Sequence, residues 1–176
     1  SKVEQMLIQA VVKDGEKIIF RDVKDENSGQ TYNLTVAQYI AYDLGSDNLG
    51  FSNELYTKIL QEAVEHCGEE GFKAEEYFTQ HADINIASVA VRLSVDRFQL
   101  AESLQVKETE QTLRDRVIHL VADFRLEYVS SHLKELNERL LQVKDSQEIQ
   151  EIMSEIMRTQ NLRNELAKKI GSNILV

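Results

Sequence analysis

The feature that most constrains this chain is a long run without any helix-breaking residue. Residues 109–144 contain neither glycine nor proline, and the full 176-residue sequence contains no proline at all. Proline breaks a helix because it lacks the backbone N–H and its ring collides with the preceding turn. The run therefore predicts a single helix of roughly 35 residues, about 50 Å long at 1.5 Å per residue.

The apolar face of this predicted helix changes direction part-way along it. At ~100° per residue, one set of apolar residues gathers on one side, and the next set lies on a side rotated by roughly 130°. A heptad pattern drifts by only ~20° per heptad, which is too little to explain the change. We expect the first half to complete an N-terminal bundle and the second half to pack against the C-terminal end of the chain. The first set is Leu113, Val117, Leu120, Val121, Phe124 and Tyr128, and the second is Val129, Leu133, Leu136, Leu140 and Val143.

A short turn and a last helix come after the long one. Asp145 and Glu148 have the spacing of a capping box, in which two side chains satisfy opposite backbone donors at a helix start. We expect the last helix to run to about Lys169, with Gly171 as the C-cap residue. Because a turn this short makes neighbouring helices antiparallel, residues 128–176 are predicted to form a helical hairpin.

The N-terminal part is predicted to be a helical bundle with a short β-hairpin. Apolar spacing indicates helices over residues 3–12 and 84–93 and a brief one over 75–79. Residues 17–34 have the composition of a β-hairpin, Thr35 and Gln38 have capping-box spacing, and Ser52 is expected to cap a further helix. Residues 94–106 are expected to be less regular. The expected fold class is mostly α, with a bundle subdomain over 1–127 joined by the long helix to a hairpin subdomain over 128–176.

The charge distribution argues against direct nucleic-acid binding. The net charge is −10; residues 1–105 hold 9 basic and 18 acidic residues, and residues 106–176 hold 11 and 12. Binding to phosphates needs a basic surface, and neither part has a basic surplus. No apolar run approaches the ~20 residues that span a bilayer, so no membrane partner is expected. The single cysteine, Cys67, fits a reduced, cytoplasmic setting, and an initial serine suggests a piece of a longer protein.

The sequence contains no recognisable catalytic, metal-binding or cofactor-binding motif. The four histidines show none of the metal-binding spacings, and a lone histidine is more often structural. No glycine-rich phosphate loop is present, and one cysteine cannot make a zinc ribbon. We therefore expect neither an enzyme nor a metal or cofactor site in this chain.

The apolar stripe on the predicted last helix is the best candidate for an interface. It consists of Ile149, Ile152, Met153, Ile156 and Met157, and it is wider than the facing leucines of the long helix can cover. Methionine suits an adaptable interface because its thioether side chain repacks easily. Two readings stay open: the stripe is the hairpin's own seam or a homodimer contact, or it binds another protein as a helix face.

Several segments resemble the C-terminal domain of bacterial DnaG-type primases. The terminal segment 162–169 looks like the end of those primases, and residues 76–104 are similar to the pattern that leads into their long helix. Residues 4–17 resemble the first helix of the same domain in the Bacteroidetes-like branch. The resemblance implies a bundle followed by a hairpin that binds the hexameric replicative helicase and couples primer synthesis to the fork. It also implies no catalysis here, because the family's catalytic residues lie in other domains. The expected contacts are Asn164, Leu166 and Lys168, which match the terminal motif, and Ile149, Ile152, Met153 and Ile156, which rest on amphipathicity alone.

The same predicted helices are also consistent with a protein of another class. Long amphipathic helices also pair between chains, so a homodimeric coiled-coil scaffold or regulator is the alternative. The mass of the chain in dilute solution separates the two, because a scaffold is a tight dimer without helicase, whereas a helicase-binding domain self-associates weakly at most.

Overall fold

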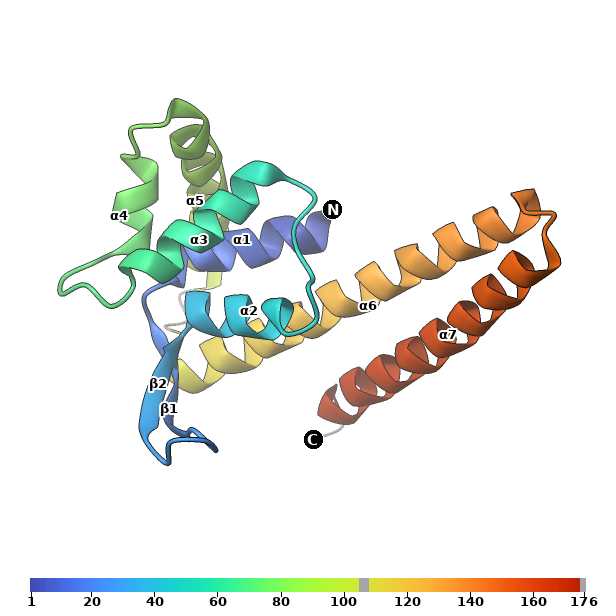
Figure 1. Ribbon diagram of the computed structural model, residues 1–176. Coiled ribbons are helices and arrows are strands. Elements are labelled where there is room, and N and C mark those ends of the chain that lie inside the picture. Colours follow the sequence, from blue (N-terminus) through green and yellow to red (C-terminus); the bar gives the residue numbers. More distant parts are fainter. Residues whose placement is uncertain (105–107, 175–176) are drawn as a thin grey trace. The chain divides into compact units, whose positions relative to one another are not determined.

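The computed structural model describes the backbone of residues 1–104 and 108–174 and the side chains of residues 1–95 and 108–170. The fold is mostly α with one small antiparallel sheet, as the sequence predicts (Figure 1). The chain divides into two compact units, Ser1–Val121 and Ala122–Val176, and α6 runs through both. The elements are α1 (Lys2–Asp14), β1 (Ile18–Lys24), β2 (Thr31–Thr35), α2 (Val36–Gly45), α3 (Glu54–His66), α4 (Ala74–Thr79), α5 (Ile84–Leu104), α6 (Glu110–Gln142) and α7 (Ser146–Ile174).

The first unit is built around α1. This helix contacts α2, α3, α4 and α5, while its face with Lys2, Gln5 and Met6 is exposed. Leu7, Ile8 and Val11 are completely buried. Each of several surrounding elements of the unit also contributes a large apolar residue that is completely buried. Burial of this kind, at roughly 25 cal/mol per Å² of apolar surface, is the main source of stability for a bundle. These surrounding residues are Ile19, Ile40, Ile59, Phe78 and Val117.

The predicted β-hairpin is confirmed. β1 and β2 pair antiparallel with Ile18 opposite Thr35 and Lys24 opposite Thr31, and the register shifts twice between these pairs. A two-stranded hairpin is marginal by itself. Here Ile19 is fully buried, and the ring of Phe20 lies 5.1 Å from that of Tyr39 on α2, so the sheet is anchored to the helices of its own unit.

Helix caps confirm one prediction and correct another. At the start of α2, the hydroxyl of Thr35 accepts from the N–H of Gln38 at 3.2 Å, and the Gln38 amide accepts from the N–H of Thr35 at 3.0 Å. This is the capping box that the spacing predicts. The prediction for Ser52 is wrong: Asn53 caps α3 by accepting from the N–H of Leu55, and the Ser52 hydroxyl donates to Glu4.

Two helices are longer than predicted. α5 continues to Leu104, so the expected irregularity of residues 94–104 is wrong, and residues 105–106 lie outside the described residues. Residues 94–104 contain no glycine or proline, so nothing in them stops a helix. α7 continues past Gly171 to Ile174, because a glycine permits a helix end but costs only about 1 kcal/mol inside a helix.

The change of apolar face along α6 is present in the structure. Leu113 and Val117 are buried in the first unit, and Leu133 and Leu136 are buried in the second. Tyr128, which the sequence assigns to the first face, is 45% exposed. The compact units divide at residue 121, within this helix, whereas the sequence-based boundary lies after residue 127.

Glu16 is a site where pH should change stability in a defined direction. Burial raises its pKa above 4.5, against the hydrogen bonds from its own N–H and that of Ala74 and the nearby charge of Lys17. A raised pKa in the folded state gives stability that is present below pH 4.5 and lost as pH rises through the folded value. Glu16→Gln is therefore expected to raise the melting temperature at pH 7 but not at pH 3.5. Thermal melts followed by circular dichroism check this, with the exposed Glu54→Gln as control; an equal change at both pH values would contradict it.

Candidate functional site

The second unit is a helical hairpin with a tight turn. The second half of α6 and all of α7 run antiparallel and are joined by residues 143–145 (Figure 1). At the start of α7, the Asp145 side chain accepts from the N–H of Glu148 at 3.3 Å, and the Asp145 carbonyl accepts from Ile149. Asp145 thus accepts from a free backbone donor at the helix start, which is its half of the capping box that the spacing predicts, and this fixes the point where the chain reverses.

An apolar seam holds the two helices together. Leu133 and Leu136 from α6 meet Ile152 and Ile156 from α7 in one buried cluster. Leu140 and Val143 cover the cluster toward the turn. A polar contact also joins the helices: Nε2 of His132 lies 3.1 Å from the Glu155 carboxylate. The hairpin therefore has a core of its own, although a small one.

The seven predicted contact residues fall on two different faces of α7. Ile152 and Ile156 are 3% and 9% exposed in the seam, so their side chains are occupied within the hairpin. The remaining five are not buried and differ in how far they reach solvent. Ile149 and Leu166 are half-buried, and Met153, Asn164 and Lys168 are exposed.

An exposed line of side chains runs along α7 beside the seam. Successive members are four, three, four and four residues apart, so they stay within roughly 80° of one another at ~100° per residue. We call this line the methionine stripe. It begins with Met153 and Met157, which are 53% and 65% exposed. Its members are Met153, Met157, Gln160, Asn164 and Lys168, all exposed.

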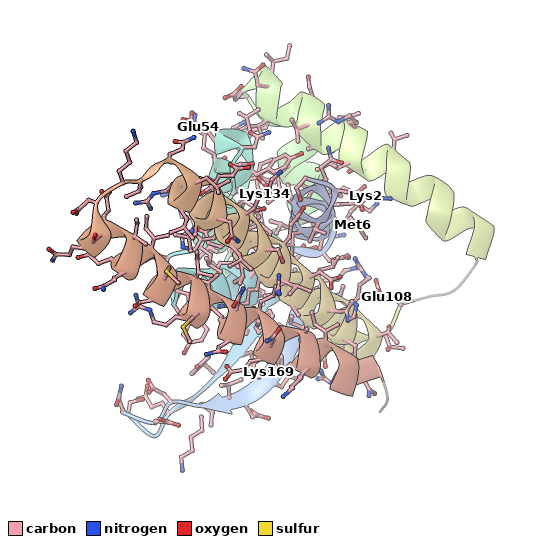
Figure 2. The ribbon with its side chains drawn as sticks, turned by 90° about the vertical axis from the view of Figure 1, so that its right-hand side faces the viewer. Lys2, Met6, Glu54, Glu108, Lys134 and Lys169 are labelled. Atoms are coloured by element: carbon pink, nitrogen blue, oxygen red, sulfur yellow. The ribbon has the colours of Figure 1, made fainter. Side chains whose placement is uncertain are left out.

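Two members of the stripe were not among the predicted contacts. Met157 and Gln160 line up with Met153 and Asn164 in any helix that is continuous over residues 153–164, and both the predicted helix and α7 are continuous there. The signal was available in the four-residue spacing from Met153 to Met157. Other exposed side chains flank the seam as well; Lys134 on α6 and Lys169 on α7 are labelled in Figure 2.

Comparison with known protein families gives one match. The model for the family described as a domain of unknown function, DUF8430, matches residues 1–174. The chain belongs to this family. The match covers both compact units, so the bundle and the hairpin are parts of one DUF8430 domain. No curated protein and no solved structure matches the chain.

A metal site and a membrane span are absent from the part of the DUF8430 domain that the structure describes. Among the side chains that the structure describes, those of residues 1–95 and 108–170, no group of three or more from His, Cys, Asp or Glu is arranged to hold a metal ion. Within residues 1–104 and 108–174, no helix combines the length and the apolar character that crossing a membrane requires. The methionine stripe is the feature of the hairpin best suited to an interaction, because it combines large apolar side chains with exposure.

Proposed function

We propose that this chain is the non-catalytic, helicase-binding C-terminal domain of a bacterial DnaG-type primase. Its hairpin would dock on the hexameric replicative helicase in the cytoplasm and so couple primer synthesis to the fork, with DNA contacted only through that partner. The observation that carries the proposal is the exposed methionine stripe on a hairpin whose seam is already filled. Asn164 and Lys168 of the stripe also belong to the terminal segment on which the primase resemblance rests.

The physical character of the stripe supports binding to another protein. Met153 and Met157 place two large, flexible apolar side chains in solvent, and methionine is enriched at protein interfaces because it adapts to the partner's shape. A single helix face of this kind fits a helix-on-helix or helix-in-groove mode of binding. Gln160, Asn164 and Lys168 would form the polar part of such an interface.

The charge of the hairpin also favours its use as a docking element. Residues 122–176 contain 8 basic and 9 acidic residues, whereas residues 1–121 contain 12 and 21. A strongly acidic surface repels other acidic proteins over the Debye length of about 8 Å at physiological salt. The nearly neutral hairpin avoids this repulsion, so apolar contact can decide its binding.

Binding to the helicase is expected to depend on the methionine stripe. The double variant Met153→Glu/Met157→Glu should bind the cognate hexameric helicase at least tenfold more weakly than the wild-type chain, because it places two charges in an interface. Surface-immobilised helicase and the full chain as analyte give the dissociation constants. Since both positions are exposed, the thermal melt of the variant should match that of the wild type.

A matched control lies on the same helix. Leu162 is 48% exposed and about 180° around α7 from Met153 at ~100° per residue, so Leu162→Glu is expected to bind normally. Equal weakening by the control and the double variant would remove the stripe from the interface. Absence of binding by the wild-type chain would overturn the whole assignment.

A second candidate function, a homodimeric scaffold, is favoured by a different surface. On α5, Ile84, Val91 and Val95 are 77%, 46% and 51% exposed. Their spacing of seven and four residues is that of a coiled-coil seam. Sedimentation equilibrium of the chain without helicase separates the two functions: a tight dimer favours the scaffold, and a monomer that binds helicase rules it out.

A further inference from the structure

The first unit has a surface cavity that the proposed function does not use. Its volume is about 650 Å³, and it lies between α3 and the segment that contains α4. The cavity combines acidic and aromatic side chains with a single lysine. The lining residues that matter here are Glu62, Phe72, Lys73, Glu76, Tyr77 and His81.

The carboxylate of Glu62 is the centre of a hydrogen-bond network at this cavity. The Tyr77 hydroxyl donates to Glu62 Oε1 at 3.1 Å, and Nε2 of His81 lies 3.0 and 3.1 Å from the two carboxylate oxygens. The Glu62 side chain is 27% exposed and that of His81 14%. The carboxylate is thus partly removed from water but still faces the cavity.

The protonation of His81 follows from its second hydrogen bond. The backbone N–H of Asp83 donates to Nδ1 of His81 at 2.9 Å, so Nδ1 must present a lone pair. The ring proton is then on Nε2, and the imidazole is the neutral tautomer that donates to Glu62. Among the described residues, Glu62 therefore receives two neutral donors at this site and no positive charge, an arrangement that costs free energy for a partly buried carboxylate.

Aromatic rings form the other part of the site. The rings of Phe72 and Tyr77 lie 5.3 Å apart, and that of His66 lies 4.9 Å from Tyr77. The face of an aromatic ring attracts a cation within about 6 Å of its centroid. The chain already uses this interaction elsewhere, because the guanidinium of Arg114 lies 5.8 Å from the centre of the Phe20 ring.

The surroundings of the cavity are negative. The pKa of Tyr77 is raised, first by burial, then by its hydrogen bond to Glu62 and by the charges of Glu62, Glu65 and Glu69. Lys73 supplies one positive charge to the lining against Glu62 and Glu76. A positively charged ligand would therefore be favoured over a neutral one of the same shape.

We propose that this cavity binds the arginine side chain of a basic peptide segment, with the guanidinium against the Phe72 and Tyr77 rings and hydrogen-bonded to Glu62 and Glu76. Arginine fits better than lysine because its planar guanidinium stacks on rings and donates to two carboxylates in a fixed geometry. The proposal does not depend on helicase binding by the hairpin, which lies in the other unit.

The test uses a peptide with a single arginine and its neutral isostere. Acetyl-Gly-Arg-Gly-amide is titrated into the full chain, and the aromatic NMR signals of His66, Phe72, Tyr77 and His81 are followed. We expect saturable shifts with a dissociation constant on the order of 1 mM, a scale suited to one small polar ligand. The same peptide with citrulline in place of arginine should give no saturable shifts; equal shifts with both peptides would overturn the proposal.

Variants locate the binding. Glu62→Gln should weaken binding roughly tenfold, the scale of one charged hydrogen bond, and Glu76→Gln should weaken it several-fold. Glu76 is exposed and is outside the Glu62 network, so its variant keeps the test valid if Glu62→Gln lowers stability. Glu54→Gln on the same helix as Glu62, labelled in Figure 2, removes the same charge away from the cavity. Normal binding by both cavity variants, or equal loss in the control, would overturn the proposal.

Discussion

Replacing Leu136 by alanine is expected to unfold the hairpin while the first unit stays folded. Leu136 is 1% exposed and is one of four buried members of the seam among the residues whose side chains the structure describes. A buried leucine-to-alanine change costs roughly 2–5 kcal/mol, because the lost apolar transfer energy and the cavity left behind add together. Because the seam is small, few other contacts can compensate. The loss of free energy should therefore exceed the stability that the hairpin's own core provides.

Hydrogen exchange measured by mass spectrometry distinguishes this outcome from general destabilisation. Backbone amides of α7 should lose their protection in Leu136→Ala, and amides of α1, at the centre of the first unit, should keep theirs. Leu141→Ala is the matched control: it is the same chemical change on the same helix, but Leu141 is 87% exposed, so its effect should be within about 0.5 kcal/mol. Equal loss of protection in α1 and α7 would show that the two units unfold together.

The elements that could be predicted are those specified by local sequence. The absence of glycine and proline from residues 109–144 predicts α6, and the change of its apolar face predicts that its two halves are buried in different places. The Thr35 and Gln38 capping box is also local, because both partners lie within four residues. Such signals depend on backbone geometry and helical spacing alone, so they could be found without knowing the rest of the fold.

Periodicity did not separate the two faces of α7. Ile152, Met153, Ile156 and Met157 all belong to one broad apolar stripe in the sequence. Which of them enter the seam depends on how the facing helix is rotated, and the spacing on α7 does not contain that information. In the structure Ile152 and Ile156 are buried and the two methionines are exposed. The two isoleucines of the predicted interface therefore belong to the core of the hairpin, and the two methionines remain as candidates for an interface.

The long-range polar contacts of the first unit could not be predicted, because their partners are distant in sequence. Glu62 and His81 are 19 residues apart, and Tyr77 is 15 from Glu62. These separations in sequence match no motif, so the sequence alone favours a structural role for His81. The incorrect cap at Ser52 has the same cause: its partner is Glu4, 48 residues away. Tertiary hydrogen bonds of this kind override a local capping preference.

The hydrogen bond between Ser52 and Glu4 leads to a second prediction: Glu4→Ala should strongly lower the stability of the first unit. Glu4 is only 4% exposed, and its carboxylate accepts from the Ser52 hydroxyl at 3.0 and 3.2 Å and from the N–H of Asn53 at 3.2 Å. Alanine leaves both donors without this acceptor and opens a small cavity. Ser52 and Asn53 are exposed, so water can replace the acceptor, and the cost is that of losing hydrogen bonds to a charged group, about 1.5–3 kcal/mol each. A total loss on the order of 2–4 kcal/mol is expected.

The position of these donors makes the effect on α3 specific. Asn53 is the N-cap residue of α3, so losing Glu4 should release the start of that helix from α1 as well as lower the stability of the unit. Urea unfolding gives the free energy, and hydrogen exchange at residues 54–58 reports the helix start. Glu4→Gln keeps one acceptor oxygen and should cost less than half as much, and the exposed Glu54→Ala on α3 should cost about 0.5 kcal/mol or less. If Glu4→Ala were as mild as Glu54→Ala, the carboxylate would not be what joins α1 to the start of α3.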